Sequence, residues 1–335
     1  MKKLILILVI FYLSLPGMVN AANYVPPASC KYGGNDIIPS PDGETMVESA
    51  TGQPANGLRC TSYGFLHSEA PYKDGKRDGM SRDYYRGGEL WIETVYKNGA
   101  KEGMEVEYYE SGKLKYESPY KNGKRDGMST GYYESGKLMS KLSFKNGKEE
   151  GLTRGYYENG RLKTALPLKN GKIDGIFREY YESGKLKKEI PYKSNIMKGT
   201  GREYYENGQL KSEMPYKDGV KEGMEKFYHE SGQLMNETPF RNGKMEGVER
   251  LYYESGELWL ETSYKNGLRE GISKFYSQSG KLRAEFPYQN GLREGMERVY
   301  DEGGKLRRET FYENGECEWI KVYDENGELQ EESGK

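Results

Sequence analysis

The side chains that most often carry chemistry in proteins are few in this sequence and stand far apart. There are two histidines, His67 and His229, and three cysteines, Cys30, Cys60 and Cys317. Zinc sites need such ligands in closely spaced groups, and the sequence has no such group. His229 replaces one tyrosine of a repeated Tyr-Tyr pair, so it is most simply a variant surface residue. The sequence therefore predicts no metal site.

The other candidates for catalysis are equally weak. Serines occur mainly in turn sequences, without a histidine base that could activate them. Gly199-Thr200-Gly201 resembles part of a phosphate-binding loop, but no helix-forming segment follows it. The glutamates recur together with basic residues, which favours a solvated charge ladder over paired catalytic carboxylates. We expect a protein that is not an enzyme and that uses no cofactor.

Aromatic side chains are the remaining candidates for function, because the chain has 31 tyrosines. Their simplest role is to cover a thin sheet, since a ring buries a large area and keeps a polar tip. Trp91 and Trp259 replace the Lys or Met that is usual at their position. Together with Tyr109 and Tyr133 they form the predicted binding surface, on which a sugar or a peptide could stack.

A period of 24 residues organises everything between Gly79 and Glu318. A chain with such a period is a stack of one small unit and has no single central core. One tyrosine column has no exceptions over ten units, and its members are Tyr84, Tyr108, Tyr132, Tyr156, Tyr180, Tyr204, Tyr228, Tyr252, Tyr276 and Tyr300.

Each unit has the pattern of one β-hairpin. In Gly103–Asp126, two runs of strand-favouring residues are bounded by the turn sequences Ser111-Gly112 and Asn122-Gly123. No helical periodicity is present. The predicted fold is therefore all-β: an elongated, twisted, single-layer antiparallel sheet of about eleven tandem hairpins.

Charge pairing suggests the register. If Ser-Gly is a two-residue type I′ turn, Glu182 lies opposite Lys185 and Arg178 lies opposite Glu189. The rival, a three-residue loop with a Gly bulge, sets Arg298 opposite Arg308, which cross-strand electrostatics disfavours. We therefore expect the two-residue turn.

This register also assigns residues to faces. It places Tyr109, Leu114, Ser118 and Tyr120 on a more apolar face, and Met104 and Tyr108 on the other face beside the Arg–Glu ladder.

Two irregularities are expected in the strands. The strand should end or bulge at prolines such as Pro119, which cannot donate a ladder hydrogen bond. Lys193–Lys198 lacks the Asn-Gly pair, so a local bend is expected there.

Composition limits the partners. Apolar residues make up 35% of the chain, below the roughly 45–50% of an ordinary domain. The 51 Lys and Arg nearly balance the 52 Asp and Glu. A nucleic-acid groove needs a net positive charge, so we do not expect nucleic acid as a partner.

The N-terminus has the pattern of an export signal. Lys2 and Lys3 precede the apolar run Leu4–Leu15, and Val19-Asn20-Ala21 supplies the small residues of a cleavage site. The run is short for a membrane span, which favours cleavage near Ala21 over a retained anchor. The mature chain is then expected in the periplasm, at the cell surface or secreted.

Export predicts oxidised cysteines. Cys30 and Cys60 are candidates for a disulfide, and Cys317 is then left free or available for an intermolecular bond.

The predicted organisation has five parts. They are a signal peptide (1–21), a loop-rich segment (22–56), a shortened first repeat (57–78), ten units of 24 residues (79–318), and a partial repeat with an acidic cap (319–335).

The repeat resembles the MORN-repeat variant. The resemblance lies in Tyr132-Tyr133-Glu134-Ser135-Gly136-Lys137-Leu138 and Phe144-Lys145-Asn146-Gly147-Lys148, and it extends over about residues 57–329. It implies an elongated twisted sheet of hairpins. Bacterial members often carry the label of YwqK-type antitoxins, and eukaryotic MORN proteins are scaffolds that bind proteins and sometimes lipids. The family supplies no catalytic residues.

Three functions follow as hypotheses. The first is an exported, non-enzymatic scaffold that binds a protein partner. The second is an antitoxin or immunity-like protein, which rests on the resemblance and conflicts with export. The third is a glycan-binding surface protein that uses Trp91 and Trp259. Membrane lipid stays open as a ligand, and so does self-association through the apolar face of the sheet.

Overall fold

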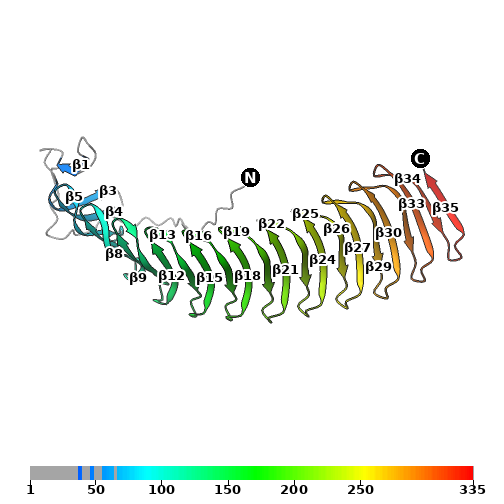
Figure 1. Ribbon diagram of the computed structural model, residues 1–335, viewed down its shortest axis with the longest axis horizontal. Coiled ribbons are helices and arrows are strands. Elements are labelled where there is room, and N and C mark those ends of the chain that lie inside the picture. Colours follow the sequence, from blue (N-terminus) through cyan, green and yellow to red (C-terminus); the bar gives the residue numbers. More distant parts are fainter. Residues whose placement is uncertain (1–36, 40–45, 49–54, 64–65, 335) are drawn as a thin grey trace. The chain divides into compact units, whose positions relative to one another are not determined.

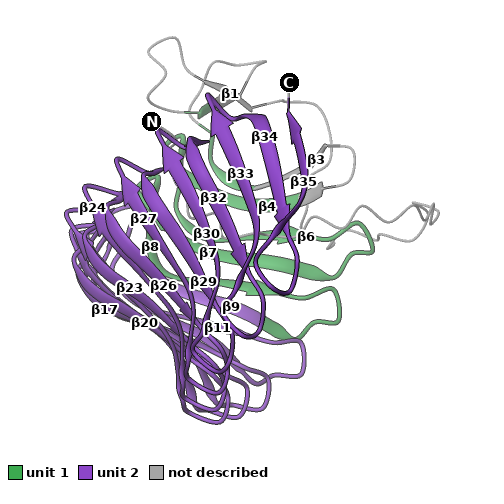
Figure 2. Ribbon diagram, turned by 90° about the vertical axis from the view of Figure 1, so that its right-hand side faces the viewer, with its two compact units in different colours: residues 1–114 green, residues 115–335 purple. Residues whose placement is uncertain are grey.

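The structure, a computed structural model, describes residues 37–39, 46–48, 55–63 and 66–334. Every regular element in these ranges is a β-strand, and every strand pairing is antiparallel. The all-β prediction is confirmed. Among these residues there is no helix long and apolar enough to cross a membrane. The chain divides into two compact units, 1–114 and 115–335, which Figure 2 colours separately.

The first unit contains a small two-stranded ribbon and the first repeats. Strand β1 pairs with β2, and the later strands pair in the order β3–β4–β6–β7–β8. The bounds are β1 Ile37–Pro39, β2 Met46–Glu48, β3 Gly57–Tyr63, β4 Leu66–Lys73, β5 Lys76–Arg77, β6 Gly79–Tyr84, β7 Leu90–Lys97 and β8 Ala100–Tyr108.

The turn after β4 is held by the residues that precede the repeats. The Gly75 N–H donates to the Ala55 carbonyl (2.9 Å), and the Met46 N–H donates to the Gly75 carbonyl (2.7 Å). The Asp74 N–H donates to the Asn56 side chain (2.8 Å). In later repeats a carboxylate of the preceding repeat accepts the equivalent N–H. For example, the Asn146 N–H donates to the Asp126 carboxylate (3.0 Å). Asn56 therefore replaces a missing preceding repeat.

The second unit is an open antiparallel sheet in which hairpins follow one another in chain order (Figure 1). Up to residue 300, each repeat has a strand of eight residues, a strand of two and a strand of six, and strands of eight, eight and six residues follow. The bounds are β9 Leu114–Lys121, β10 Lys124–Arg125, β11 Gly127–Tyr132, β12 Leu138–Lys145, β13 Lys148–Glu149, β14 Gly151–Tyr156, β15 Leu162–Lys169, β16 Lys172–Ile173, β17 Gly175–Tyr180, β18 Leu186–Lys193, β19 Ile196–Met197, β20 Gly199–Tyr204, β21 Leu210–Lys217, β22 Val220–Lys221, β23 Gly223–Tyr228, β24 Leu234–Arg241, β25 Lys244–Met245, β26 Gly247–Tyr252, β27 Leu258–Lys265, β28 Leu268–Arg269, β29 Gly271–Tyr276, β30 Leu282–Gln289, β31 Leu292–Arg293, β32 Gly295–Tyr300, β33 Leu306–Glu313, β34 Glu316–Tyr323 and β35 Leu329–Gly334.

The predicted two-residue Ser-Gly turn is wrong. In the hairpin of β17 and β18, the Gly184 N–H donates to the Tyr181 carbonyl and the Tyr181 N–H donates to the Lys185 carbonyl, both at 2.8 Å. Glu182, Ser183 and Gly184 are thus a three-residue loop, in which Gly184 has a positive φ (+88°) and Ser183 does not. Tyr181, and not Glu182, lies opposite Lys185.

The predicted register of the ladder is nevertheless confirmed. Arg178 pairs with Glu189, because a β-bulge near Tyr180 offsets the shift that the loop introduces. Tyr180 pairs with Leu186 and Glu179 pairs with Lys188, so Lys187 is the extra residue. The hairpin thus avoids the like-charge pairs that a three-residue loop alone would create.

The Asn-Gly pairs form hairpin turns, as predicted, and these turns have type I′ geometry. Asn122 and Gly123 both have positive φ (50° and 76°), and Lys121 pairs with Lys124. The expected bend at Lys193–Lys198 is absent, because Ser194 and Asn195 adopt the same turn (φ 49° and 70°). The Asn195 side chain accepts the Ile173 N–H (2.6 Å), which helps to hold this residue in the place of the usual glycine.

The prolines do not end their strand. Strand β9 continues through Pro119, and the partner strand is interrupted between β10 and β11. There the Asp126 N–H donates to the Pro119 carbonyl (2.9 Å), and Gly127 has φ +122°. A Cβ on Gly127 would lie 2.8 Å from the proline Cγ. Repeats with serine in place of proline have the same contact, as Glu150 donates to Ser143 (2.9 Å). We call Gly127 and the equivalent glycines of the other repeats the bulge glycines. The interruption of the strand before each bulge glycine does not depend on the proline.

The sheet has two different faces. On the first, which we call the aromatic face, Arg125 lies over Tyr120 and Phe144, and Ser118 and Ser129 are fully buried and hydrogen-bonded (2.7 Å). Small polar residues under rings and cations thus take the place of a thick apolar core.

The second face, which we call the ladder face, carries the ion pairs of Arg with Glu. Arg202 and Arg250 lie 2.9 Å from Glu213 and Glu261 respectively. The leucine column belongs here, because Leu138 pairs directly with Tyr132, whose hydroxyl contacts the ladder. Placing leucine with the more apolar face was wrong, since the bulge next to it reverses the alternation.

Candidate binding surfaces

Each tyrosine of the Tyr-Tyr pair connects its hairpin to a different neighbour. The first tyrosine lies on the ladder face, and its hydroxyl donates to a glutamate of the preceding repeat. Tyr132 donates to Glu117 (2.9 Å) and Tyr300 donates to Glu285 (3.1 Å). Burial is the main cause that raises the pKa of these two phenols, and the neighbouring carboxylate raises the pKa further. The unbroken column is therefore structural.

The second tyrosine reaches forward to the next repeat. The Tyr133 hydroxyl donates to the Tyr156 carbonyl (2.6 Å). In the next two repeats the hydroxyls of Tyr157 and Tyr181 make the equivalent hydrogen bond (2.7 Å each). We call this contact the tyrosine bridge. Tyr133, predicted as part of a binding surface, thus uses its polar tip within the fold. Tyr109 has the same place in its hairpin, since its N–H donates to the Lys113 carbonyl (2.8 Å).

Trp91 and Trp259 occupy the extra position of the β-bulge, which places them on the aromatic face. Trp91, in the first unit, lies against Tyr85 with ring centroids 5.9 Å apart and donates from Nε1 to Glu107 (3.2 Å). Trp259, in the second unit, is 40% exposed. The two tryptophans have equivalent positions, but they lie in different units, and each is a separate candidate.

Trp259 belongs to a continuous cluster of rings. Its centroid lies 6.1 Å from that of Tyr253 and 6.4 Å from that of Phe275, which in turn lies 5.1 Å from Phe286. The tilted and edge-on geometries are those that aromatic pairs prefer. With its exposed tryptophan, this cluster can offer a stacking surface to a flat apolar ligand.

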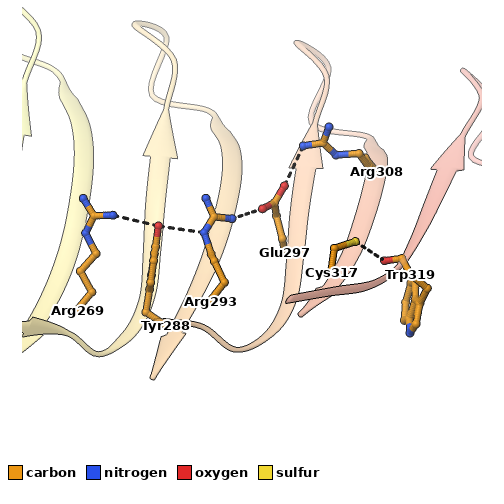
Figure 3. A network of polar contacts seen from close by, with 7 residues as sticks. All are labelled: Arg269, Tyr288, Arg293, Glu297, Arg308, Cys317 and Trp319. Atoms are coloured by element: carbon orange, nitrogen blue, oxygen red, sulfur yellow. Dashed lines mark hydrogen bonds and ion pairs between the residues drawn. The ribbon is translucent and has the colours of Figure 1, made fainter. Parts of the chain in front are cut away.

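Charged side chains on the aromatic face are satisfied by one another. Figure 3 shows Tyr288 accepting hydrogen bonds from Arg269 and Arg293, both at 3.1 Å. Glu297, 3% exposed, is paired with Arg293 and with Arg308 (2.8 Å). A carboxylate held between two guanidinium groups is a structural ion pair. The free Cys317 lies nearby, with its Sγ 3.9 Å from the Trp319 carbonyl.

The ladder face carries a column of which the sequence analysis named one member, Met104, without proposing a binding surface there. The residue after the bulge glycine is apolar in most repeats and remains partly exposed. The side chains with their exposed fractions are Met128 45%, Leu152 37%, Ile176 40%, Met224 37% and Ile272 50%. We call these residues the apolar column. An apolar residue after the glycine in nine of the ten periods was the available signal, with Thr200 as the exception.

The remaining predicted residues do not form a site. His229 replaces a bridging tyrosine, and its Nε2 is buried without a hydrogen-bond partner. Cys30 and the side chains of Cys60 and His67 lie outside the described residues, so the disulfide stays a prediction. Within the described ranges, no three His, Cys, Asp or Glu side chains are arranged to hold a metal ion.

Comparisons with individual known proteins find only weak similarity. No curated protein matches the chain. Two solved structures, titled "Crystal Structure of TcdB2-TccC3-Cdc42" and "Crystal Structure of TcdB2-TccC3", match 79% of this chain at 9% identity, with TM-scores of 0.14 and 0.13. The chain spans about a fifth of their length (19% and 20%), and similarity this low carries no argument.

The family comparison is specific. The model described as MORN repeat variant matches residues 77–98, 101–122, 125–146, 149–170, 173–194, 197–218, 221–242, 245–266, 269–290 and 293–314. These ten matches keep the 24-residue period, and each begins in the short strand before the bulge glycine or at the equivalent position. With the turns, the paired tyrosines and the hairpin geometry, they show that the chain belongs to the MORN repeat variant family.

Proposed function

We propose that the chain is an exported, non-enzymatic scaffold that binds a protein partner along the ladder face of its second unit. The observation that carries the proposal is the apolar column, since large apolar side chains stay partly exposed at regular intervals on the face that carries the Arg–Glu ion pairs. Recurrent exposed apolar surface is typical of an interaction site.

The chemistry of the column suits an extended protein surface. Met128 and Leu152 are two strands apart, which corresponds to about 10 Å. A partner that covers several members buries apolar area at each step, with a gain of roughly 25 cal/mol per Å². Methionine adapts its shape to a partner, so the column tolerates partners that are not rigidly complementary.

Site-specific photo-crosslinking tests the face. A crosslinking side chain at position 128, 152 or 176 should capture the same partner in cells. Matched controls are Lys163, Lys211 and Met235, which are exposed on the aromatic face. Equal crosslinking from both faces, or none from the apolar column, would contradict the proposal.

Export is tested separately. The motive is the basic, apolar and small-residue pattern that ends at Ala21. A C-terminally tagged chain should be found outside the cytoplasm, and N-terminal sequencing should begin near residue 22. A full-length chain confined to the cytoplasm would remove the export part of the proposal. It would also strengthen the antitoxin alternative, which otherwise rests on the family resemblance alone.

A second candidate function is glycan binding, which the ring cluster around the exposed Trp259 favours. The test is pull-down on cell-wall polysaccharide. Trp259→Ala should reduce retention, whereas Trp319→Ala should not, because Trp319 stacks on Phe311 at a ladder-face position (5.9 Å). No retention of the unmodified chain would rule this function out.

A further inference from the structure

We propose that the outer edge of β35 is a docking site for an extended segment of a partner protein in which a Lys or Arg stands two residues before a Tyr. The segment would add one strand to the sheet. This proposal refines the proposed function by naming the partner's chemistry, and it rests on that function only in making the chain a protein binder. It concerns a different surface.

The repeats themselves show what such an edge receives. From β18 to β33, the six-residue or longer strand that follows each eight-residue strand places a basic residue opposite the glutamate of the ladder, as Arg298 pairs with Glu285. Two residues later in the same strand, the Tyr300 hydroxyl donates to Glu285 (3.1 Å). The following repeat has the same contacts, since Lys321 pairs with Glu309 and Tyr323 donates to it (2.8 Å).

Strand β35 reproduces the receiving half of this contact. Its Glu332 pairs with Lys321, as Glu309 pairs with Arg298 in the preceding hairpin. Glu332 lies 3.4 Å from the Lys321 ammonium and its side chain is 54% exposed, against 17% for Glu309. Among the described residues β35 pairs only with β34, and the Tyr323 hydroxyl donates to Glu309 and not to Glu332. The outer backbone edge of β35 and the Glu332 carboxylate therefore correspond to the groups that receive the following strand in the internal repeats.

The charges of the edge select a basic partner. Strand β35 has the sequence Leu-Gln-Glu-Glu-Ser-Gly, and all six residues are exposed. Pairing with a second β35 would bring glutamates together, which is unfavourable. Strand β3 of a second copy does not match either, because it has Cys60 and Ser62 where internal strands have Arg and Tyr. A different protein with a Lys-x-Tyr or Arg-x-Tyr strand fits the edge, and strand addition of this kind is a known mode of recognition.

A peptide experiment on the full chain tests the proposal. The probe is a labelled, end-capped peptide with the sequence of Gly271–Ser277, Gly-Ile-Ser-Lys-Phe-Tyr-Ser, which contains the motif and no acidic residue. We expect saturable binding by fluorescence anisotropy. Glu332→Gln should weaken it about fivefold or more, because an ion pair and a charged hydrogen bond are lost.

The matched control is Glu331→Gln. Glu331 lies in the same strand with the same charge, but it pairs with Val322 and faces away from the ladder. It should change binding less than twofold. In the peptide, Lys274→Glu and Tyr276→Phe should each weaken binding. Hydrogen exchange should show protection confined to residues 329–334.

Three results would overturn the proposal. They are equal binding by the two protein variants, protection elsewhere in the sheet, and a stable dimer whose contact covers β35. Crosslinking from the apolar column and peptide binding are both measured on the chain with an unmodified β35. Crosslinks from the column in a chain that does not bind the peptide would reject the edge site and leave the proposed function standing. Peptide binding without crosslinks from the column would do the reverse.

Discussion

At the scale of the residue, the paired tyrosines show how one side-chain type serves two opposite contacts. The first reaches back to a glutamate of the preceding repeat, and the second reaches forward to a carbonyl of the next. A single layer has little apolar area to bury, so its hairpins also rely on such directed hydrogen bonds. This is why a column of tyrosines, which suggests ligand binding in the sequence, is part of the fold.

Removing a tyrosine bridge should loosen one junction between hairpins. Tyr157→Phe leaves the Tyr180 carbonyl without its 2.7 Å partner, and we expect a loss of about 1 kcal/mol in the free energy of unfolding. Hydrogen exchange should accelerate mainly around residues 156–180. The reverse variant is Ser277→Tyr, which supplies a tyrosine at a position that lacks one. Slower exchange near Tyr300 is expected, and no change in either variant would contradict the role of the bridge.

The bulge glycine should resist substitution to a degree set by its neighbour. Gly127→Ala meets both a positive φ and the ring of Pro119, whereas Gly151→Ala meets a positive φ and the more distant Ser143 Cβ (3.9 Å). The φ strain alone costs roughly 1–2 kcal/mol. Urea denaturation should therefore show a larger loss for Gly127→Ala. Adding Pro119→Ser should recover part of it, and an absence of recovery would show that the ring contact is unimportant.

At the scale of the element, the sequence predicted the hairpins, their order and the ladder register, but it failed in the Ser-Gly loop. Turn composition and charge pairing determine the length of a loop only when the strands on both sides contain no bulge. Here the three-residue loop and the bulge at Lys187 make opposite one-residue shifts, so the pairing of Arg178 with Glu189 is the same as for a two-residue turn. The bulge also moved Leu138 and Trp259 to the faces where they are found.

The loop geometry gives a prediction that separates the two turn types. Ser183 has a negative φ in a three-residue loop, so Ser183→Gly only increases the freedom of the unfolded chain and should destabilise the hairpin by roughly 0.5–1 kcal/mol. In a type I′ turn Ser183 would have a positive φ, so glycine at this position would remove backbone strain and stabilise the hairpin. The control is Asn146→Gly, where φ is +51° and little loss is expected. Thermal unfolding of both variants measures the difference, and a stabilised Ser183→Gly chain would contradict the loop.

The candidate surfaces were predicted less completely than the fold. Trp259 could be found because it interrupts a column, but its ring partners Phe275 and Phe286 come from two further strands that only the register brings near it. The face of the apolar column was predicted through Met104, but its exposure was not, because Met, Leu and Ile at one position per repeat resemble core residues. Whether they are buried depends on a second layer, and a sequence does not show whether one exists.

At the scale of the whole molecule, the stack should tolerate the loss of complete repeats. Deleting residues 175–198 removes one period and lets β15 meet β20 with the contacts that β17 made. A folded, shorter chain is expected by circular dichroism and size exclusion. Deleting only 12 residues should leave strands unpaired and cause aggregation. Aggregation of both variants would argue against nearest-neighbour stacking.

Several members of the tyrosine column should make the second unit sensitive to alkali. The pKa of Tyr132, Tyr204, Tyr252 and Tyr300 is raised in the folded chain, chiefly by burial. The folded state therefore holds these protons more tightly than the unfolded chain, whose phenols titrate near pH 10. Their contribution to stability is complete below about pH 10 and is lost as the pH rises through the folded values.

Urea midpoints between pH 8 and 11 should accordingly fall at the alkaline end. Replacing Tyr204 and Tyr252 by phenylalanine should lower stability at pH 8 and flatten the alkaline decrease. A decrease of unchanged steepness in that variant would show that these phenols are not its cause.

The order of strands in the second unit has a mechanical consequence. Because each hairpin contacts only the hairpins before and after it, a force that pulls on residue 334 bears first on β34 and β35 and then on each earlier pair in turn. The hydrogen bonds of one junction would break before the load reaches the next. Each repeat would release 24 residues, about 80 Å of extended chain. The sheet would then lengthen under tension in equal steps, one repeat at a time, and shorten again as the hairpins re-form.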